Sequence, residues 1–461
     1  MKKHLSKGFA LSFLVLTLII SFFSQPIRAL EKPKEYRSVG YVFQRGSDID
    51  KIDVTKITHL NYSFGLIYNN EYQGINPDTG KIYGTSKNPD ARTPEPVPKG
   101  KLHTIYLPEK VHLDLSRVNE LKAKNPDLKV LLSVGGWDAR GFSDMAATEE
   151  AREAFAKSCR DVIDTYKLDG IDLDWEYPVN GGWGAIKSQP EDKTNFTLML
   201  KEVRAAIGDD KLLTIAGSAN FSFTTDWTEF KAVVDILDYI NIMTYDFQYD
   251  SNYFGSAINK SEKWTPNNTD GYWVDKGVQR YVEAGCPPEK INVGIAFAAP
   301  IPAVVASSNK YKEIETKLTE VNFYESKDRV LKKVTNLLED KNGFKKNWDE
   351  KAGSSYITTE IDGKDEFVLS YIDEKGISAK TNYVKENNLG GTMFWEFGAD
   401  YDNSLVTQLA SDLELDGNGE EDQDTVADIS DNSFVLIILS SSIALIAILA
   451  VVLIKKKKEK E

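Results

Sequence analysis

Eight short apolar segments, separated by segments with helical periodicity, run through most of the 461-residue chain. Each apolar segment is short enough to be a strand, and turn residues bound it. Alternation of strands with helices is typical of parallel sheets, and eight such units favour a closed barrel over an open doubly wound sheet. We therefore predict an α/β fold, a (β/α)8 TIM barrel. The predicted strands span residues 36–43, 57–65, 128–136, 169–178, 211–218, 236–245, 291–298 and 390–397.

The segments between these strands include clear helical patterns and one interruption. About 75 residues rich in Lys, Glu, Thr and Tyr separate the seventh strand from the eighth, with strand-like pieces at 355–359 and 366–370. They predict a small α+β insertion domain at about residues 300–375. A stretch rich in Pro, Gly, Asn and Asp, residues 68–112, is expected to be a long functional or disordered loop. The predicted helices span residues 115–124, 149–166, 193–207, 230–234, 272–284 and 376–386.

The fourth predicted strand alternates acidic and apolar residues. Its sequence is Asp169-Gly170-Ile171-Asp172-Leu173-Asp174-Trp175-Glu176-Tyr177-Pro178. With a period of two, Asp172, Asp174 and Glu176 share one face, and the other face is apolar. An ordinary exposed strand is the alternative, but its polar face would carry mixed charges because like charges repel. The pattern favours a barrel strand whose outer face packs on helices and whose inner face ends at a catalytic acid array.

Three further motifs lie where the third, sixth and eighth strands end, and active sites in such barrels form at the carboxyl ends of strands. Each motif alone has a structural interpretation: Ser-x-Gly-Gly is a common tight turn, and a single Trp is often a core residue. Their joint placement favours one shared site. The motifs are Ser133-Val134-Gly135-Gly136-Trp137, Met243-Thr244-Tyr245-Asp246, and Trp395.

Together these motifs resemble glycoside hydrolase family 18, the chitinase family. The pattern Asp169-x-x-Asp172-x-Asp174-x-Glu176 is similar to its acidic signature, and the other motifs match in order and spacing. The resemblance covers residues 36–409, including an insertion domain like the small one of chitinases. Residues 294–300 depart from the pattern, in which an aromatic residue and then Gly-Arg usually follow this strand.

The resemblance implies a role for each polar residue of the site. In this family the substrate's own N-acetyl carbonyl attacks the anomeric carbon and gives an oxazolinium ion. Glu176 would protonate the glycosidic oxygen and then activate water, while Asp174 would orient the acetamide. Asp172 would tune the proton shared within the array, and Tyr245 would donate to the attacking carbonyl oxygen.

The remaining predicted site residues are substrate contacts. Trp395 would form the apolar floor beneath the sugar. Asp169 lies an odd number of positions before Asp172, so its side chain would point away from the catalytic face, and it is predicted to be structural. We also considered Trp183, Trp264 and Trp273 as sugar platforms. The full set of predicted substrate contacts is Trp395, Met243, Asp246, Trp137, Gly136, Phe64 and Tyr41.

The resemblance predicts a glycosidase that cleaves β-1,4 bonds between N-acetylglucosamine units of chitin, with retention of configuration. One alternative is an endo-β-N-acetylglucosaminidase acting on N-glycan cores or on another such glycan, for example peptidoglycan. A second is a chitin-binding lectin, which the presence of Glu176 disfavours. We expect a monomer that needs no cofactor.

The two ends of the chain predict export and anchoring. Residues 1–29 read as a signal peptide, with a basic start, an apolar run and a small-residue cleavage site. Residues 434–454 form an uncharged apolar stretch long enough to span a bilayer, and the Lys-rich residues 455–461 would stay in the cytoplasm. Residues 411–433 are predicted to be a flexible acidic linker. The catalytic domain, residues 30–410, would thus lie outside the cell, anchored in the membrane by the C-terminal helix.

Composition excludes several classes of protein. The net charge of −14 disfavours nucleic acid as a partner. Two cysteines are too few for a disulfide framework, and we expect Cys159 and Cys286 to be separate thiols, although one bridge is conceivable. Four His residues without metal-ligand spacing predict no zinc site.

Overall fold

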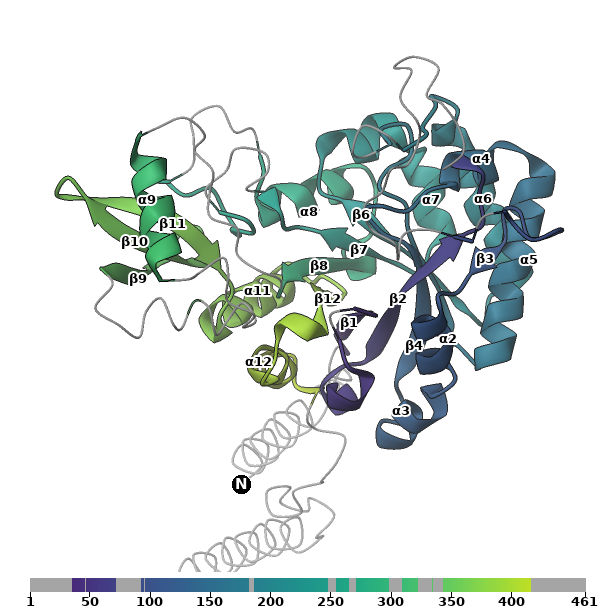
Figure 1. The fold of residues 1–461 in the computed structure, drawn as a ribbon, viewed down its shortest axis with the longest axis horizontal. Helices are drawn as coiled ribbons and strands as arrows, with labels where there is room; N and C mark the ends of the chain where they lie inside the picture. The colour runs from purple at the N-terminus through teal and green to yellow at the C-terminus, as the bar shows by residue number, and fades with distance from the viewer. Residues whose placement is uncertain are drawn as a thin grey trace, which may run out of the picture. The chain divides into compact units, whose positions relative to one another are not determined.

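Eight parallel strands form a closed barrel in the computed structural model of the chain (Figure 1). Each strand pairs with its neighbour, and β1 pairs with both β2 and β12, which closes the sheet. The predicted (β/α)8 barrel is therefore confirmed. The strands are β1 (Arg37–Phe43), β2 (His59–Ile67), β4 (Lys129–Gly135), β5 (Gly170–Asp174), β6 (Leu212–Ser218), β7 (Tyr239–Met243), β8 (Ile291–Ala296) and β12 (Gly391–Trp395). The structure describes residues 35–45, 47–71, 93–94, 96–181, 186–247, 254–264, 271–297, 309–321, 334 and 343–415.

Helices follow most barrel strands. Thr148 caps the start of the long α5, because its side chain accepts a hydrogen bond from the backbone N–H of Ala151, and Lys167 follows the helix in the left-handed conformation. The helices around the barrel are α2 (Glu109–Leu115), α3 (Val118–Lys124), α4 (Phe142–Ala147), α5 (Glu149–Tyr166), α6 (Asp192–Ile207), α7 (Phe230–Ile236), α8 (Val274–Glu283), α11 (Glu374–Glu386) and α12 (Ser404–Asp412).

The helix predictions need correction at three places. The helix predicted at residues 115–124 begins only at Val118, as α3, and a separate helix, α2, precedes it. Helix α2 ends at Ser116, whose hydroxyl donates to the carbonyls of His112 and Leu113. Part of the predicted long loop is thus helix. Helices α4 and α12 were not predicted, and α12 occupies the first residues assigned to the linker.

The apolar face of the fourth barrel strand contacts the helical layer. Ile171 and Leu173 are fully buried on β5. Trp175 stacks on Phe142 at 5.2 Å and meets the edge of Phe196 at 5.8 Å, which places its indole between α4 and α6. The outer face is therefore filled by packing, and the acidic residues are left to the barrel interior.

The insertion between β8 and β12 contains a three-stranded antiparallel sheet and a helix, as the fold prediction states. Its elements are α9 (Asn309–Glu320), β9 (Phe344–Asp349), β10 (Ser354–Ile361) and β11 (Lys364–Tyr371). Phe254, from the segment after β7, packs edge-on against Tyr356 and Phe367. Trp264, which precedes α8, lies against the same two rings, so it packs on the insertion sheet and does not line the cavity.

Cys159 and Cys286 are separate, buried thiols, as expected. Burial raises the pKa of Cys286 to about 12, so its thiol is unreactive at neutral pH. In the part of the chain that the structure describes, no helix is both long enough and apolar enough to cross a bilayer. The predicted signal peptide (1–29) and anchor (434–454) lie outside the described residues, as does the linker from residue 416 onward.

Candidate active site

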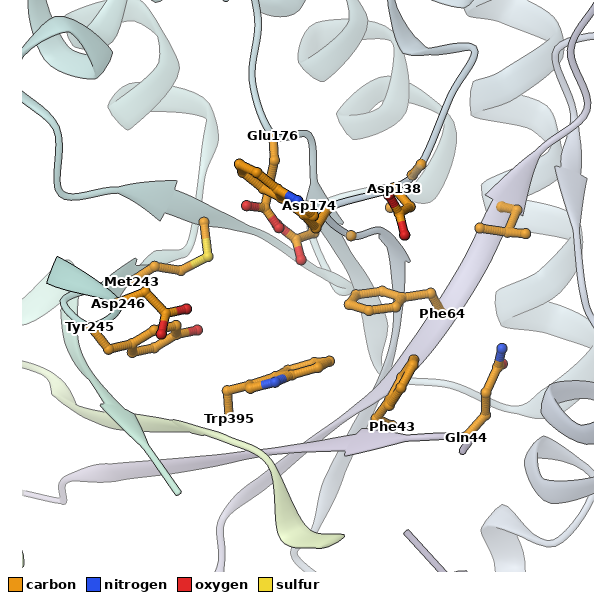
Figure 2. A pocket seen from close by; sticks show the side chains of 15 residues that line it. Phe43, Gln44, Phe64, Asp138, Asp174, Glu176, Met243, Tyr245, Asp246 and Trp395 are labelled. Atoms are coloured by element: carbon orange, nitrogen blue, oxygen red, sulfur yellow. The ribbon is translucent and has the colours of Figure 1, made fainter. Parts of the chain in front are cut away.

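A cavity of about 240 Å³ opens at the carboxyl ends of the barrel strands (Figure 2). It contains Asp174, Glu176 and most of the predicted substrate contacts. Three non-proline cis peptide bonds lie at this end of the barrel, after Ser63, Glu176 and Trp395. The cavity is lined by Phe43, Gln44, Phe64, Leu66, Gly135, Gly136, Trp137, Asp138, Ala139, Asp174, Glu176, Met243, Tyr245, Asp246 and Trp395.

Asp172 lies below the cavity and is fully buried. Its Oδ2 accepts hydrogen bonds from the hydroxyls of Tyr41 and Ser133, both at 2.8 Å. Its Oδ1 accepts from Thr214 at 2.5 Å and, more weakly, from Asn241 at 3.4 Å. Burial raises the pKa of Asp172, and these donors oppose that rise because they favour the ionised carboxylate.

Asp174 is also buried, but it receives much less hydrogen bonding. Its Oδ1 has no hydrogen-bond partner among the described residues. Burial, and then the nearby charges of Glu176 and Asp172, raise the pKa of Asp174 well above its ordinary value. Like charges this close resist simultaneous ionisation, which favours the protonated form of Asp174, and the oxygen that has no partner among the described residues can serve a ligand.

Glu176 faces the cavity beside Asp174, and Figure 2 shows the two carboxyl groups together. Burial raises the pKa of Glu176 to about 7, and the charges of Asp246 and Asp138 add to the rise. A hydrogen bond with Tyr177 acts in the opposite direction. A carboxyl group with such a pKa can both donate and accept a proton near neutral pH.

Aromatic rings form the apolar wall of the cavity. Trp395 stacks on Phe64, with 5.5 Å between the ring centroids and 19° between the ring planes. The ring centroid of Phe43 lies 5.5 Å from that of Trp395. The position of Tyr41 differs from the prediction of a substrate contact. Tyr41 is only 2% exposed and does not line the cavity, because its ring lies behind Trp395 and its hydroxyl donates to Asp172.

The motif at the end of β7 places Met243, Tyr245 and Asp246 on the cavity wall. Burial, followed by the charge of Asp174, raises the pKa of the Tyr245 hydroxyl well above its usual range, so it stays a donor. A Cβ on Gly294 would lie 2.9 Å from the Tyr245 ring and 2.3 Å from a backbone oxygen of β7. Gly294 is therefore needed for the close approach of this motif to β8.

The two glycines after β4 bring the remaining rim residues close to the acids. A Cβ on Gly135 would lie 2.0 Å from the Asp174 carbonyl oxygen, and one on Gly136 would lie 2.8 Å from the Phe64 ring. The backbone N–H of Gly136 donates to that same carbonyl oxygen at 2.9 Å. Trp137 follows at the rim with 44% of its surface exposed, which leaves its indole available for stacking.

The structure adds five lining residues that sequence reasoning missed: Phe43, Gln44, Leu66, Asp138 and Ala139. Three of them lie at or just after the carboxyl ends of the first two strands: Phe43, Gln44 and Leu66. Active sites of such barrels form at these ends, so their position in the sequence could have identified them. Asp138 directly follows the Gly-Gly-Trp motif. Its charge raises the pKa of Glu176, which no sequence pattern indicated.

Asp169 lies outside the site, as its parity predicted. Its carboxylate accepts from the backbone N–H of Val130 at 2.8 Å and pairs with Lys122 at 2.6 Å. Of the other Trp candidates, Trp183 lies outside the described residues and Trp273 precedes helix α8, away from the cavity lining. No group of three or more His, Cys, Asp or Glu residues in the described part of the chain is placed to hold a metal ion.

Comparisons with known proteins identify the family of the chain. The family described as "Glycosyl hydrolases family 18" matches residues 37–400. The chain is 33% identical over 456 residues to chitinase A1 of Niallia circulans, covering 90% of this chain and 64% of that protein. The chain therefore spans less than two thirds of this relative, and only 28% of chitinase ChiA of Flavobacterium johnsoniae.

Two solved structures have a similar fold and more than 25% sequence identity to the chain. Chitinase ChiA74 from Bacillus thuringiensis has a TM-score of 0.64 and 27% identity, covering 83% of this chain and 70% of that one. A family 18 N-acetylglucosaminidase from Paenibacillus barengoltzii has a TM-score of 0.59 and 31% identity, covering 82% of this chain and 99% of that one.

Proposed function

The chain belongs to family 18 of the glycosyl hydrolases, and from that premise we propose that it hydrolyses β-1,4 bonds between N-acetylglucosamine units of chitin or its oligosaccharides, with retention of configuration. One observation carries the proposal. Glu176, with a pKa raised to about 7, lies in one cavity with a buried Asp174 and with the stacked rings of Trp395 and Phe64. Among the described residues, one oxygen of Asp174 has no hydrogen-bond partner. Such a cavity offers an acid, an amide acceptor and an apolar floor together.

The first step uses Glu176 as the acid. A sugar stacked on Trp395 would place its glycosidic oxygen at Glu176, which transfers its proton to that oxygen as the bond to the anomeric carbon breaks. The carbonyl oxygen of the substrate's N-acetyl group forms the new bond to the anomeric carbon. Asp174 accepts a hydrogen bond from the acetamide N–H, and Tyr245 donates to the carbonyl oxygen, so both hold the internal nucleophile in line.

The second step returns the proton. The positively charged oxazolinium ion is stabilised by the negative charge of Asp174 as it ionises and shares its proton with Asp172. Glu176, now a carboxylate, takes a proton from water. The oxygen of that water attacks the anomeric carbon from the face that the leaving group left, and the oxazolinium ring opens. Two inversions at the anomeric carbon give net retention.

The direct test is hydrolysis of N-acetylglucosamine oligomers by the purified protein, with the anomer of the first product read by NMR. The matched control is the same oligomer without its N-acetyl groups, which lacks the internal nucleophile. We expect β product from the first substrate and no turnover of the second. Equal turnover of both substrates would contradict the substrate-assisted route, and no turnover of either would contradict the activity.

The names of the relatives favour chitin over N-glycan cores. Chitinase A1 and ChiA74 are both named for chitin, and both are more than 25% identical to the chain. An endo-β-N-acetylglucosaminidase would instead release the glycan from a high-mannose glycoprotein. Parallel assays on that glycoprotein and on chitin oligomers separate the two activities, and we expect turnover of the oligomers alone.

We further propose that the enzyme acts at the outer cell surface, held by residues 434–454 as a membrane anchor. The support is their apolar sequence followed by Lys455, Lys456, Lys457 and Lys458. Chitinase ChiW from Paenibacillus, which is 32% identical to the chain, is described as a bacterial cell-surface-expressed multi-modular enzyme. Fractionation of cells producing the full chain is expected to recover the activity in membranes, and release of all activity by deletion of residues 434–461 would support the anchor. Activity found only in the medium with the full chain would contradict it.

A further inference from the structure

A continuous chain of side-chain hydrogen bonds crosses the barrel interior from its amino-terminal end to Asp172. Arg37 Nε donates to Asn292 Oδ1 at 3.1 Å, and Asn292 Nδ2 donates to Asn241 Oδ1 at 2.9 Å. Asn241 Nδ2 lies 3.4 Å from Asp172 Oδ1 and 3.2 Å from the Tyr41 hydroxyl. Each link has its donor on the Arg37 side, so both amide dipoles point the same way. We call Arg37, Asn292 and Asn241 the interior chain.

The register of the barrel places the interior chain on one level. Arg37 pairs with Gly391, Gly391 with Asn292, and Asn292 with Asn241 on adjacent strands. Gly391 has no side chain, so Arg37 can reach across β12 to β8. A Cβ on Gly390 would lie 1.8 Å from Arg37 Nη2, so this position also leaves space for the guanidinium. The fold thus makes room for a cation at the end of the barrel opposite the cavity.

Aligned hydrogen bonds strengthen one another in a low-dielectric interior. The charge of Arg37 polarises Asn292, which polarises Asn241, and the amide N–H that reaches Asp172 becomes a better donor to a carboxylate. Asn241 donates one of the hydrogen bonds that lower the pKa of Asp172 and so oppose the effect of burial. Asn241 is a donor that links Asp172 to a cation.

We propose that Arg37 is a positioning residue that acts through Asn292 and Asn241 to keep Asp172 ionised. The protons of the acidic array are then held by Asp174 and Glu176. The inference rests on the proposed function, because the array must begin the reaction with Glu176 protonated. Loss of the interior chain raises the affinity of Asp172 for a proton. Asp172 then becomes protonated at a higher pH and cannot accept the Asp174 proton as the oxazolinium ion forms, so activity is lost sooner as the pH falls.

Several other ionisable groups face the two ends of the chain. Arg37 lies 4.7 Å from the centre of the Tyr239 ring, and together with burial it helps to lower the pKa of His59 to about 3. Replacement of Arg37 alone therefore changes more than the interior chain, and a variant that cuts the chain but retains the cation is also needed. The groups facing Arg37 include Tyr239, His59, Asp238 and Glu289. Those facing Asp172 include Tyr41, Asp174, Tyr239 and Tyr245.

The test compares Arg37→Met, Asn292→Leu and the double variant across a pH series, using kcat and KM for a fluorogenic N-acetylglucosamine oligomer. Arg37→Lys, which keeps the charge, is the rescue variant. Lys290→Met is the matched control, because Lys290 is another cation near the start of β8 and donates to the carbonyls of Val234 and Leu237 without joining the interior chain. We expect the acid limb of kcat/KM to move up by about half a unit to one unit in each single variant. KM should change little, and Arg37→Lys should recover part of the shift.

If the interior chain acts as one unit, the effects of its two substitutions on the pH profile are not additive. The double variant is expected to shift the acid limb no further than either single variant. A lower kcat with an unmoved pH profile would show a merely structural role and would overturn the proposal. Additive shifts, or an equal shift in Lys290→Met, would also overturn it.

A second readout does not need turnover. If Asp172 binds its proton more tightly in the folded Asn292→Leu variant, that variant loses stability relative to the unmodified chain as pH rises from about 4 to about 7. Thermal unfolding across that range is expected to show a Tm difference that widens with pH. A constant difference would overturn the proposal even if no substrate were turned over, so its failure is distinct from that of the proposed function.

Discussion

At the scale of single residues, burial and neighbouring charge give three carboxyl groups on β5 and just after it different chemistry. Asp172 is surrounded by donors, one oxygen of Asp174 has no partner among the described residues, and Glu176 faces the cavity. Replacing Glu176 by Gln removes the transferable proton while keeping the shape. We expect kcat to fall by about a thousandfold with little change in KM. Glu153→Gln, on the exposed surface of α5, is the control, and activity near normal in Glu176→Gln would contradict the assigned role.

The raised pKa of Glu176 also predicts how activity depends on pH. The acid must be protonated at the start of the reaction, so kcat/KM is expected to fall about tenfold per pH unit above a pKa of about 7. A profile that stays flat to well above that pH would exclude Glu176 as the acid.

The same shift predicts an effect on stability. Because the folded state raises the pKa of Glu176 from 4.5 to about 7, it binds this proton more tightly than the unfolded chain does. Ionisation therefore destabilises the fold progressively between those pH values, and a Gln at this position avoids that cost. We expect Glu176→Gln to be more stable than the unmodified chain by on the order of 3 kcal/mol above pH 7, with the gain lost at low pH. Urea unfolding at several pH values measures it, and a gain that does not depend on pH would contradict the linkage.

At the scale of elements, the end of β4 shows how backbone conformation decides which side chains reach the cavity. Gly136 has φ of +97°, and a Cβ there would contact the Phe64 ring at 2.8 Å. We expect Gly136→Ala to cost about 2 to 3 kcal/mol of unfolding free energy, part from φ and part from displacement of Phe64. Gly285→Ala is the control, because Gly285 has φ of +99° and nothing within 4 Å of its Cβ position. Equal losses in both variants would show that the contact with Phe64 has no effect.

At the scale of the whole molecule, the insertion is fastened to the barrel chain through Phe254, which is fully buried against Tyr356 and Phe367. Phe254→Ala is expected to cost about 3 to 5 kcal/mol locally and to loosen the insertion before the barrel unfolds. Limited proteolysis should then cut the insertion sheet while the barrel persists. Simultaneous loss of both parts would contradict separate stability.

The sequence alone determined the features that depend on local pattern. The alternation of apolar strands with helices predicted the barrel and its strands to within a few residues, because side-chain period is a local property. The parity of residues 169–176 separated the three inward acids from Asp169 and from the outward Trp175. The break between α2 and α3 escaped prediction, because it depends on how Ser116 bonds the preceding turn.

Only the tertiary structure decided features that depend on residues far apart in the chain. Tyr41 lies behind Trp395 because β1 is paired between β2 and β12, and no local pattern specifies that position. Asp172 differs from Asp174 because four strands supply its donors, which only closure of the barrel brings together. The proton affinity of Glu176 likewise depends on burial and on Asp246 and Asp138, so the chemistry of the acidic strand is set by the folded barrel around it.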